Sequence, residues 1–231
     1  MIIRTRNYTV FAYHFFPAHK SMTRYLIDIR LMGPVKRQIE KLSRNLEERF
    51  RLGNQLAVPH ITLVGPFYTE HEDRLSEDFS RICQEQQGVP NYDVGGYGVF
   101  PATRVVFVTV TPDHALRKFR FRLAQAIAPY CTLREYDRDN LDDFRFHATL
   151  AMKLDWLTFQ RVRWYIRNCE PVIHRYHPIR ATLLKNSRIV CEYDFLQERM
   201  LSPTQAMSRA TFMRDLAIIR AWESGEQESA P

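Results

Sequence analysis

Two short segments of the chain carry the same pair of reactive side chains at the same spacing. The sequence around His60 reads Pro-His-Ile-Thr-Leu, and the sequence around His147 reads Phe-His-Ala-Thr-Leu. Each lies in an apolar run that predicts a β-strand, and side chains alternate between the two faces of a strand. His60 and Thr62 therefore share one face, as do His147 and Thr149. If the two strands face one another, two imidazoles and two hydroxyls line one pocket.

These groups suit the cleavage of a phosphodiester without a metal ion. Opening a cyclic phosphate with water requires a base that takes a proton from water and an acid that gives one to the departing ribose oxygen. The ordinary histidine pKa of about 6.5 allows one imidazole to be neutral and the other protonated near neutral pH. Threonine hydroxyls can donate hydrogen bonds to the phosphate oxygens. We therefore expect His60 and His147 to form an acid–base pair, with either ring in either role, and Thr62 and Thr149 to hold the phosphate.

The repetition of the motif favours this interpretation. One histidine in a strand is more often a structural residue than a catalyst. Two His-x-Thr-Leu segments in one chain are hard to obtain by chance. The competing explanation is a structural α+β domain in which the two motifs are coincidental.

The two motifs resemble the signature of the two-histidine (2H) phosphoesterase superfamily, which includes the 2′–5′ RNA ligase-like and RNA 2′,3′-cyclic phosphodiesterase families. The resemblance extends to residues 25–31 as an opening strand, to the Gly-Pro-Phe at 65–67, and to the late segment 191–201. It implies an α+β, bilobal and pseudo-symmetric fold, in which two antiparallel sheets form a central cleft with helices on the outside. It also implies that a 2′,3′-cyclic phosphate opens to leave a 2′-phosphate, and that the reverse direction forms a 2′–5′ linkage.

The resemblance also divides the chain. Residues 23–201 fit a single bilobal domain, which leaves residues 1–22 as an N-terminal extension and residues 202–231 as a C-terminal helix and frayed tail. Many superfamily members carry an arginine three positions after the second threonine, where this chain has Met152. Lys153 is adjacent and follows the same strand alternation as His147 and Thr149, so it is a candidate for the missing cation.

Three further residues are weaker candidates for substrate contacts. Phe67 and Tyr68 follow the first motif and could stack a nucleobase. Their alternative role is core packing under a loop. Arg188 could meet a phosphate, as could Lys153, although a solvated surface position is the usual place for such residues.

Hydrophobic periodicity places the motifs among mixed strands and helices. Strands are predicted at 25–31, 58–64, 92–100, 104–111, 145–153, 179–185 and 189–195. Helices are predicted at 34–50, 73–87, 113–130, 156–169 and 203–222. Because strands and helices are mixed rather than strictly alternating, the order favours an α+β fold with antiparallel pairing.

Composition narrows the class of partner. The 231 residues suit one large domain or two closely joined lobes, and the net charge of +7 favours RNA or phosphorylated nucleotides as partners. The four cysteines have neither disulfide-framework nor zinc-site spacing, so we expect reduced thiols in a cytoplasmic protein. No apolar run approaches the length of a membrane span, and the run at residues 10–16 does not suit a signal peptide. No phosphate-binding glycine loop and no metal-ligand cluster stand out, so no metal and no cofactor are expected.

Three functions agree with these observations. The first is an RNA-end phosphodiesterase that acts on 2′,3′-cyclic phosphates or 2′–5′ linkages, with ligation as its reverse. The second is the same chemistry on a small cyclic or 2′–5′ nucleotide. The third is an RNA-binding module that keeps the fold with little turnover. The sequence carries no signal of oligomeric state.

Overall fold

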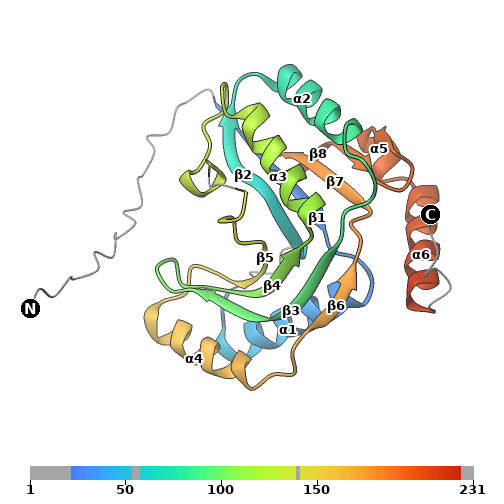
Figure 1. The fold of residues 1–231 in the computed structure, drawn as a ribbon. Coiled ribbons are helices and arrows are strands. Elements are labelled where there is room, and N and C mark those ends of the chain that lie inside the picture. Colours follow the sequence, from blue (N-terminus) through green and yellow to red (C-terminus); the bar gives the residue numbers. More distant parts are fainter. Residues whose placement is uncertain (1–21, 54–57, 139–140, 225–231) are drawn as a thin grey trace, which may run out of the picture.

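The computed structural model of the protein describes residues 22–53, 58–138 and 141–224. Nearly all of the predicted N-terminal extension lies outside the described residues, including the apolar run at 10–16, and so does the tail after residue 224. The described chain folds into two β-sheets flanked by helices (Figure 1).

The strands are β1 (Thr23–Arg30), β2 (His60–Thr69), β3 (Tyr92–Phe100), β4 (Val105–Pro112), β5 (His147–Ala151), β6 (Ile173–Tyr176), β7 (Arg180–Lys185), β8 (Arg188–Asp194) and β9 (Arg199–Leu201). The helices are α1 (Gly33–Phe50), α2 (Glu72–Gln84), α3 (His114–Ile127), α4 (Trp156–Arg167), α5 (Pro203–Ala206) and α6 (Arg209–Glu223), with a short 3-10 helix, η1 (Glu135–Arg138).

Within the described chain, neighbouring strands of both sheets pair antiparallel. One sheet has five strands in the order β2-β1-β7-β8-β9, and the other has four in the order β5-β4-β3-β6. The motif strands β2 and β5 are therefore edge strands, and these two edges contact each other. This arrangement confirms the predicted α+β class with two antiparallel sheets, and it joins two motifs that are distant in the sequence.

Two pairs of helices cover the sheets. Helices α2 and α3 contact strands of the five-stranded sheet, and α1 and α4 contact strands of the four-stranded sheet (Figure 1). Each of the four is amphipathic and buries its apolar stripe; in α1 the buried residues are Val35, Ile39, Leu42 and Leu46. Helix α1 lies in sequence between two strands of the five-stranded sheet, yet it covers the four-stranded one. Helix α3 crosses in the opposite direction, so the two halves are interleaved.

The C-terminal helices are attached to the five-stranded sheet by buried charges. Arg180 of β7, only 7% exposed, pairs with Glu192 at 2.9 Å and also with Asp215 of α6. Arg214 pairs with Asp215 at 2.9 Å and with Asp194 of β8. Since a charge left unpaired in such a network is costly, these contacts hold α6 against β7 and β8.

Several boundaries differ from the predicted ones. Strand β5 is shorter than predicted, and the short strands β6 and β9 were not predicted because four and three residues give no clear period-2 signal. The single C-terminal helix predicted at 203–222 is two helices. The first has a capping box between Ser202 and Gln205, and a second cap follows, where the Ser208 hydroxyl accepts a hydrogen bond from the Thr211 backbone N–H at 3.1 Å.

Candidate active site

The two motifs have the same local structure. Burial alternates along both: Pro59, Ile61 and Leu63 are buried and the intervening histidine and threonine are half-buried, and residues 146–150 repeat this pattern. The apolar side chains face the core, which fixes the direction of the polar ones. We call the four half-buried side chains, His60, Thr62, His147 and Thr149, the motif face.

Both imidazoles are oriented by the same kind of hydrogen bond. Nδ1 of His60 lies 2.8 Å from the Val58 carbonyl oxygen, and Nδ1 of His147 lies 2.8 Å from the Arg145 carbonyl oxygen. A carbonyl oxygen only accepts, so each Nδ1 must carry the hydrogen. Each ring therefore presents Nε2 to a substrate, as a lone pair when neutral and as a proton donor when charged.

His147 lies in an aromatic environment. Its ring centroid is 5.0 Å from that of Phe100 and 5.1 Å from that of Phe107, and the register of β4 and β5 places Phe107 opposite Thr149. Burial lowers the pKa of His147; the bond to the Arg145 carbonyl opposes this, and the positive charge of His60 lowers the pKa further. The effect of His60 on His147 agrees with the contact between β2 and β5.

His60 has charged neighbours instead. In the register of β1 and β2, Arg30 lies opposite His60 and Asp28 opposite Thr62, so both charged residues point to the side of the sheet that carries the first motif. Arg30 is half-buried and forms no ion pair with any residue that the structure describes. It is therefore a cation available beside the motif face.

A buried ion pair joins the end of the first motif to the segment that precedes the second. Arg120 of α3, 1% exposed, donates to the Leu63 carbonyl at 3.1 Å, and its guanidinium stacks 3.8 Å above the Phe144 ring. It also pairs with Asp137 of η1, which accepts a hydrogen bond from the Gly65 backbone N–H at 3.1 Å. These contacts fix β2 relative to the approach to β5, and so support the spacing of the two motifs.

Comparison with known proteins identifies the family. The sequence matches the family profile of the 2'-5' RNA ligase superfamily over residues 33–185, which include both motifs. The chain belongs to this superfamily, the 2H phosphoesterases. A search of curated protein sequences found no significant match.

Several solved structures are similar to this 2H chain at low sequence identity. A crystal structure described as a phosphoesterase is 17% identical, with a TM-score of 0.47 over 78% of this chain and 94% of that one. E. coli LigT complexed with ATP is 16% identical, with a TM-score of 0.46 over 78% and 93% of the two chains. Kluyveromyces marxianus Usb1 with uridine monophosphate is 16% identical, with a TM-score of 0.40 over 75% and 98%.

Two predicted stacking residues of this 2H chain lie far from the motif face. Phe67 is 0% exposed and stacks on Tyr25 in the core with ring centroids 6.0 Å apart, so it is not available to a nucleobase. Tyr68 is half-buried and lies opposite Arg24, eight residues along β2 from His60. That spacing corresponds to roughly 25 Å of extended chain. The apolar residues after the first motif pack the far end of the sheet.

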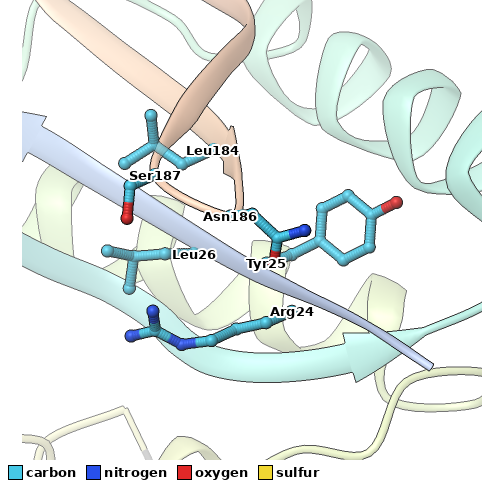
Figure 2. Close-up of a pocket in the computed structure, with 6 residues that line it drawn as sticks. All are labelled: Arg24, Tyr25, Leu26, Leu184, Asn186 and Ser187. Carbon is cyan, nitrogen blue, oxygen red and sulfur yellow. The ribbon is translucent and has the colours of Figure 1, made fainter. Parts of the chain in front are cut away.

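Arg188 lies at the same far end. It is exposed and pairs with Lys185 directly after the β7–β8 turn, and Lys185 lies opposite Tyr25 at the start of β1. A small hollow at this turn is lined by Arg24, Tyr25, Leu26, Leu184, Asn186 and Ser187 (Figure 2). Because His60 lies opposite Arg30, roughly 17 Å further along β1, Arg188 is not a neighbour of the motif face.

The predicted position of Lys153 also changes. Strand β5 ends at Ala151, and the chain bends so that Leu154 is buried and Asp155 caps α4 by accepting from the Thr158 backbone N–H at 3.0 Å. Lys153 lies in this bend with φ 57°, and both it and Met152 are exposed. The strand alternation that linked Lys153 to His147 therefore does not reach it.

The described residues contain neither a metal-binding cluster nor a membrane-spanning helix. No group of three or more His, Cys, Asp or Glu side chains there is arranged to hold a metal ion. No helix in that part of the chain is long and apolar enough to cross a bilayer. Metal independence stays a prediction.

Proposed function

We propose that this protein is a metal-independent RNA phosphodiesterase that opens 2′,3′-cyclic phosphates at RNA ends, leaving a 2′-phosphate, and that can cleave or form 2′–5′ linkages by the reverse chemistry. His60 and His147 act as the acid–base pair, and Thr62 and Thr149 donate to the phosphate oxygens. The observation that carries this proposal is the motif face itself. Two contacting edge strands present two imidazoles, each with Nδ1 bound to a carbonyl and Nε2 free for proton transfer.

Arg30 is the cation that we assign to the phosphate, in the role that the sequence suggested for Lys153. It lies directly opposite His60 and has no carboxylate partner among the described residues. A guanidinium beside the threonine hydroxyls would stabilise the charge that develops on the phosphate oxygens. The net charge of +7 supports a polyanionic substrate.

Phe100 is the side chain that we assign to the substrate base. It is half-buried, and its ring contacts His147 edge to face. Stacking a base on an aromatic ring is worth about 1–3 kcal/mol in ssRNA-binding proteins. Phe100 therefore takes the role that the sequence suggested for Phe67 and Tyr68.

The test is a substrate panel with three histidine variants. Purified wild type, H60A, H147A and H174A are supplied with 2′,3′-cyclic mononucleotides, an oligoribonucleotide with a cyclic end, and a 2′–5′ dinucleotide. We expect H60A and H147A each to lower the rate by about 10²–10⁴-fold, the usual contribution of general acid–base catalysis. His174 is the matched control because it lies on β6 and contacts Gln38 at 3.0 Å, away from the motif face; H174A should keep its activity.

The same panel separates the alternatives. Preference for mononucleotides over the oligomer would favour a small nucleotide as substrate, and tight binding without product would favour an RNA-binding module. Phosphate that remains on the 2′ oxygen supports the proposed regiochemistry. Turnover that persists in EDTA supports metal independence. Folded H60A and H147A with wild-type rates would refute the mechanism.

We also propose a cytoplasmic location. Cys83, Cys131, Cys169 and Cys191 are free thiols in this structure, as suits a reducing compartment. Fractionation of cells that express the tagged protein would test this directly.

A further inference from the structure

Asp28 is a buried carboxylate adjacent to the first motif. It lies directly opposite Thr62 on β2 and directly opposite Thr182 on β7, while Arg30 lies opposite His60. Directly opposed Cβ atoms in an antiparallel pair are about 4.5–5.5 Å apart, and diagonal ones about 7–8 Å. Asp28 is therefore a direct neighbour of Thr62 and a diagonal neighbour of His60, on the same side of the sheet.

No packing role accounts for this carboxylate. Asp28 is 3% exposed, and its Oδ1 accepts no hydrogen bond from any residue that the structure describes. Other buried carboxylates nearby are satisfied: Glu192 accepts from Arg180 and from Thr182. Burying a carboxylate oxygen without a donor costs free energy. The fold therefore holds at Asp28 a charge that does not serve its stability.

The charged groups that face Asp28 are His60 on β2, Arg30 on its own strand and Glu192 on β8; its neighbour on β7 is the uncharged Thr182. Burial raises the pKa of Asp28 to about 6, the positive charges of His60 and Arg30 oppose that rise, and Glu192 adds to it. Since electrostatic coupling between two groups is reciprocal, ionised Asp28 stabilises the imidazolium form of His60.

The second motif has the opposite environment. Phe100 and Phe107 contact His147, and burial favours its neutral ring by lowering its pKa. A neutral ring with Nδ1 bound to a carbonyl has its lone pair on Nε2, which is the form that a general base requires. The two motifs are therefore alike in geometry and unlike in the protonation state that their neighbours favour.

We propose that Asp28 is a positioning residue that keeps His60 protonated, so that His60 is the general acid and His147 the general base when the cyclic phosphate opens. This assignment rests on the proposed function. Nε2 of His147 takes a proton from water as the water oxygen bonds to phosphorus. The bond from phosphorus to the ribose 3′ oxygen breaks, and that oxygen takes the proton from Nε2 of His60. The product keeps its phosphate on the 2′ oxygen.

The first test measures protonation directly. In protein with isotope-labelled histidine, NMR follows the pH at which each ring loses its proton, with H60A and H147A used to assign the signals. We expect D28N to move the titration midpoint of His60 to lower pH by about one unit, the effect of losing a nearby carboxylate. The matched control is D137N, the same substitution at a buried carboxylate that contacts Gly65 and Arg120 instead, and it should leave that midpoint in place.

The second test needs no variant of Asp28. A 2′,3′-cyclic phosphate with sulfur in place of the 3′ oxygen has a leaving group that departs without a proton. H60A should regain at least tenfold relative to its rate on the oxygen substrate, whereas H147A should not. The pH profile gives a third readout: at pH 8 D28N should be about tenfold slower than wild type, with a smaller difference near pH 6.

The outcomes separate the two proposals. Rescue of H147A instead of H60A, or an unmoved His60 midpoint in folded D28N, would overturn the assignment of roles and leave the phosphodiesterase proposal intact. Normal turnover of the oxygen substrate by both histidine variants would overturn the phosphodiesterase proposal itself.

Discussion

The two motifs provide a comparison within one molecule. Each orients its histidine by a 2.8 Å bond to the carbonyl two residues earlier, and each buries its apolar side chains on the opposite face. Their surroundings differ: His60 lies among charged side chains of β1, and His147 lies against two phenylalanine rings from β3 and β4. Five residues are enough to aim an imidazole, but tertiary neighbours decide which protonation state it favours.

The largest expected effect concerns the threonines, which occupy equivalent positions in the two motifs. T62V and T149V each remove one hydroxyl while keeping side-chain volume, and each should lower kcat by about 10²–10³-fold, as loss of one oxyanion donor does. T62S and T149S keep the hydroxyl and should stay within tenfold of wild type. A loss confined to one of the two valine variants would show that only one strand holds the phosphate.

A second prediction concerns stability, where only the first motif has a buried carboxylate. The pKa of Asp28 is raised to about 6 in the folded protein, from its ordinary value of 3.8. Its contribution to stability is therefore full below about pH 4 and is lost as the pH rises through 6. This shift corresponds to about 3 kcal/mol. The stability of D28N relative to wild type should rise by up to this amount between pH 4 and pH 7.

Urea unfolding of both proteins across this pH range measures the difference, and groups common to both cancel. Any constant cost of burying the asparagine amide shifts the curve without changing its slope. Parallel stability curves for the two proteins would mean that Asp28 titrates alike in the folded and unfolded states.

The smallest expected effect concerns the aromatic side of the second motif. F107L opens part of the cover over His147, so burial should lower the pKa of that ring less. The acidic limb of kcat/KM should move to higher pH by about half a unit, which is a few-fold loss of rate near pH 6 and none at pH 8. F79L changes the same residue type in the core under α2 and should leave the limb unmoved. An unmoved limb in F107L would contradict the role of burial at His147.

Sequence reasoning reached the parts of the site that depend on local pattern. Alternation along a strand is a local property, so the shared face of His60 and Thr62 and that of His147 and Thr149 could be predicted before the fold was known. Most long helices and strands were predicted within a few residues because their hydrophobic period is long enough to detect. The antiparallel α+β class followed from the order of these elements.

The rest depends on which strands pair. Asp28 and Arg30 join the site because β1 pairs with β2, and Phe107 because β4 pairs with β5. A single sequence does not specify these registers. The opposite failure occurred at Phe67, where closeness to His60 in sequence suggested closeness in space, although the strand carries it into the core at the far end of the sheet.

The exchange of helices between the two sheets has a further consequence for how the molecule can be divided. A cut in the turn between β3 and β4 would leave α1 on a fragment without most of the strands it covers, and α3 on a fragment without β2. Neither piece would have a complete layer over its own sheet, so the pieces should acquire structure only when mixed. Split-protein complementation, with recovery of turnover as its signal, is therefore the natural form in which to engineer this chain.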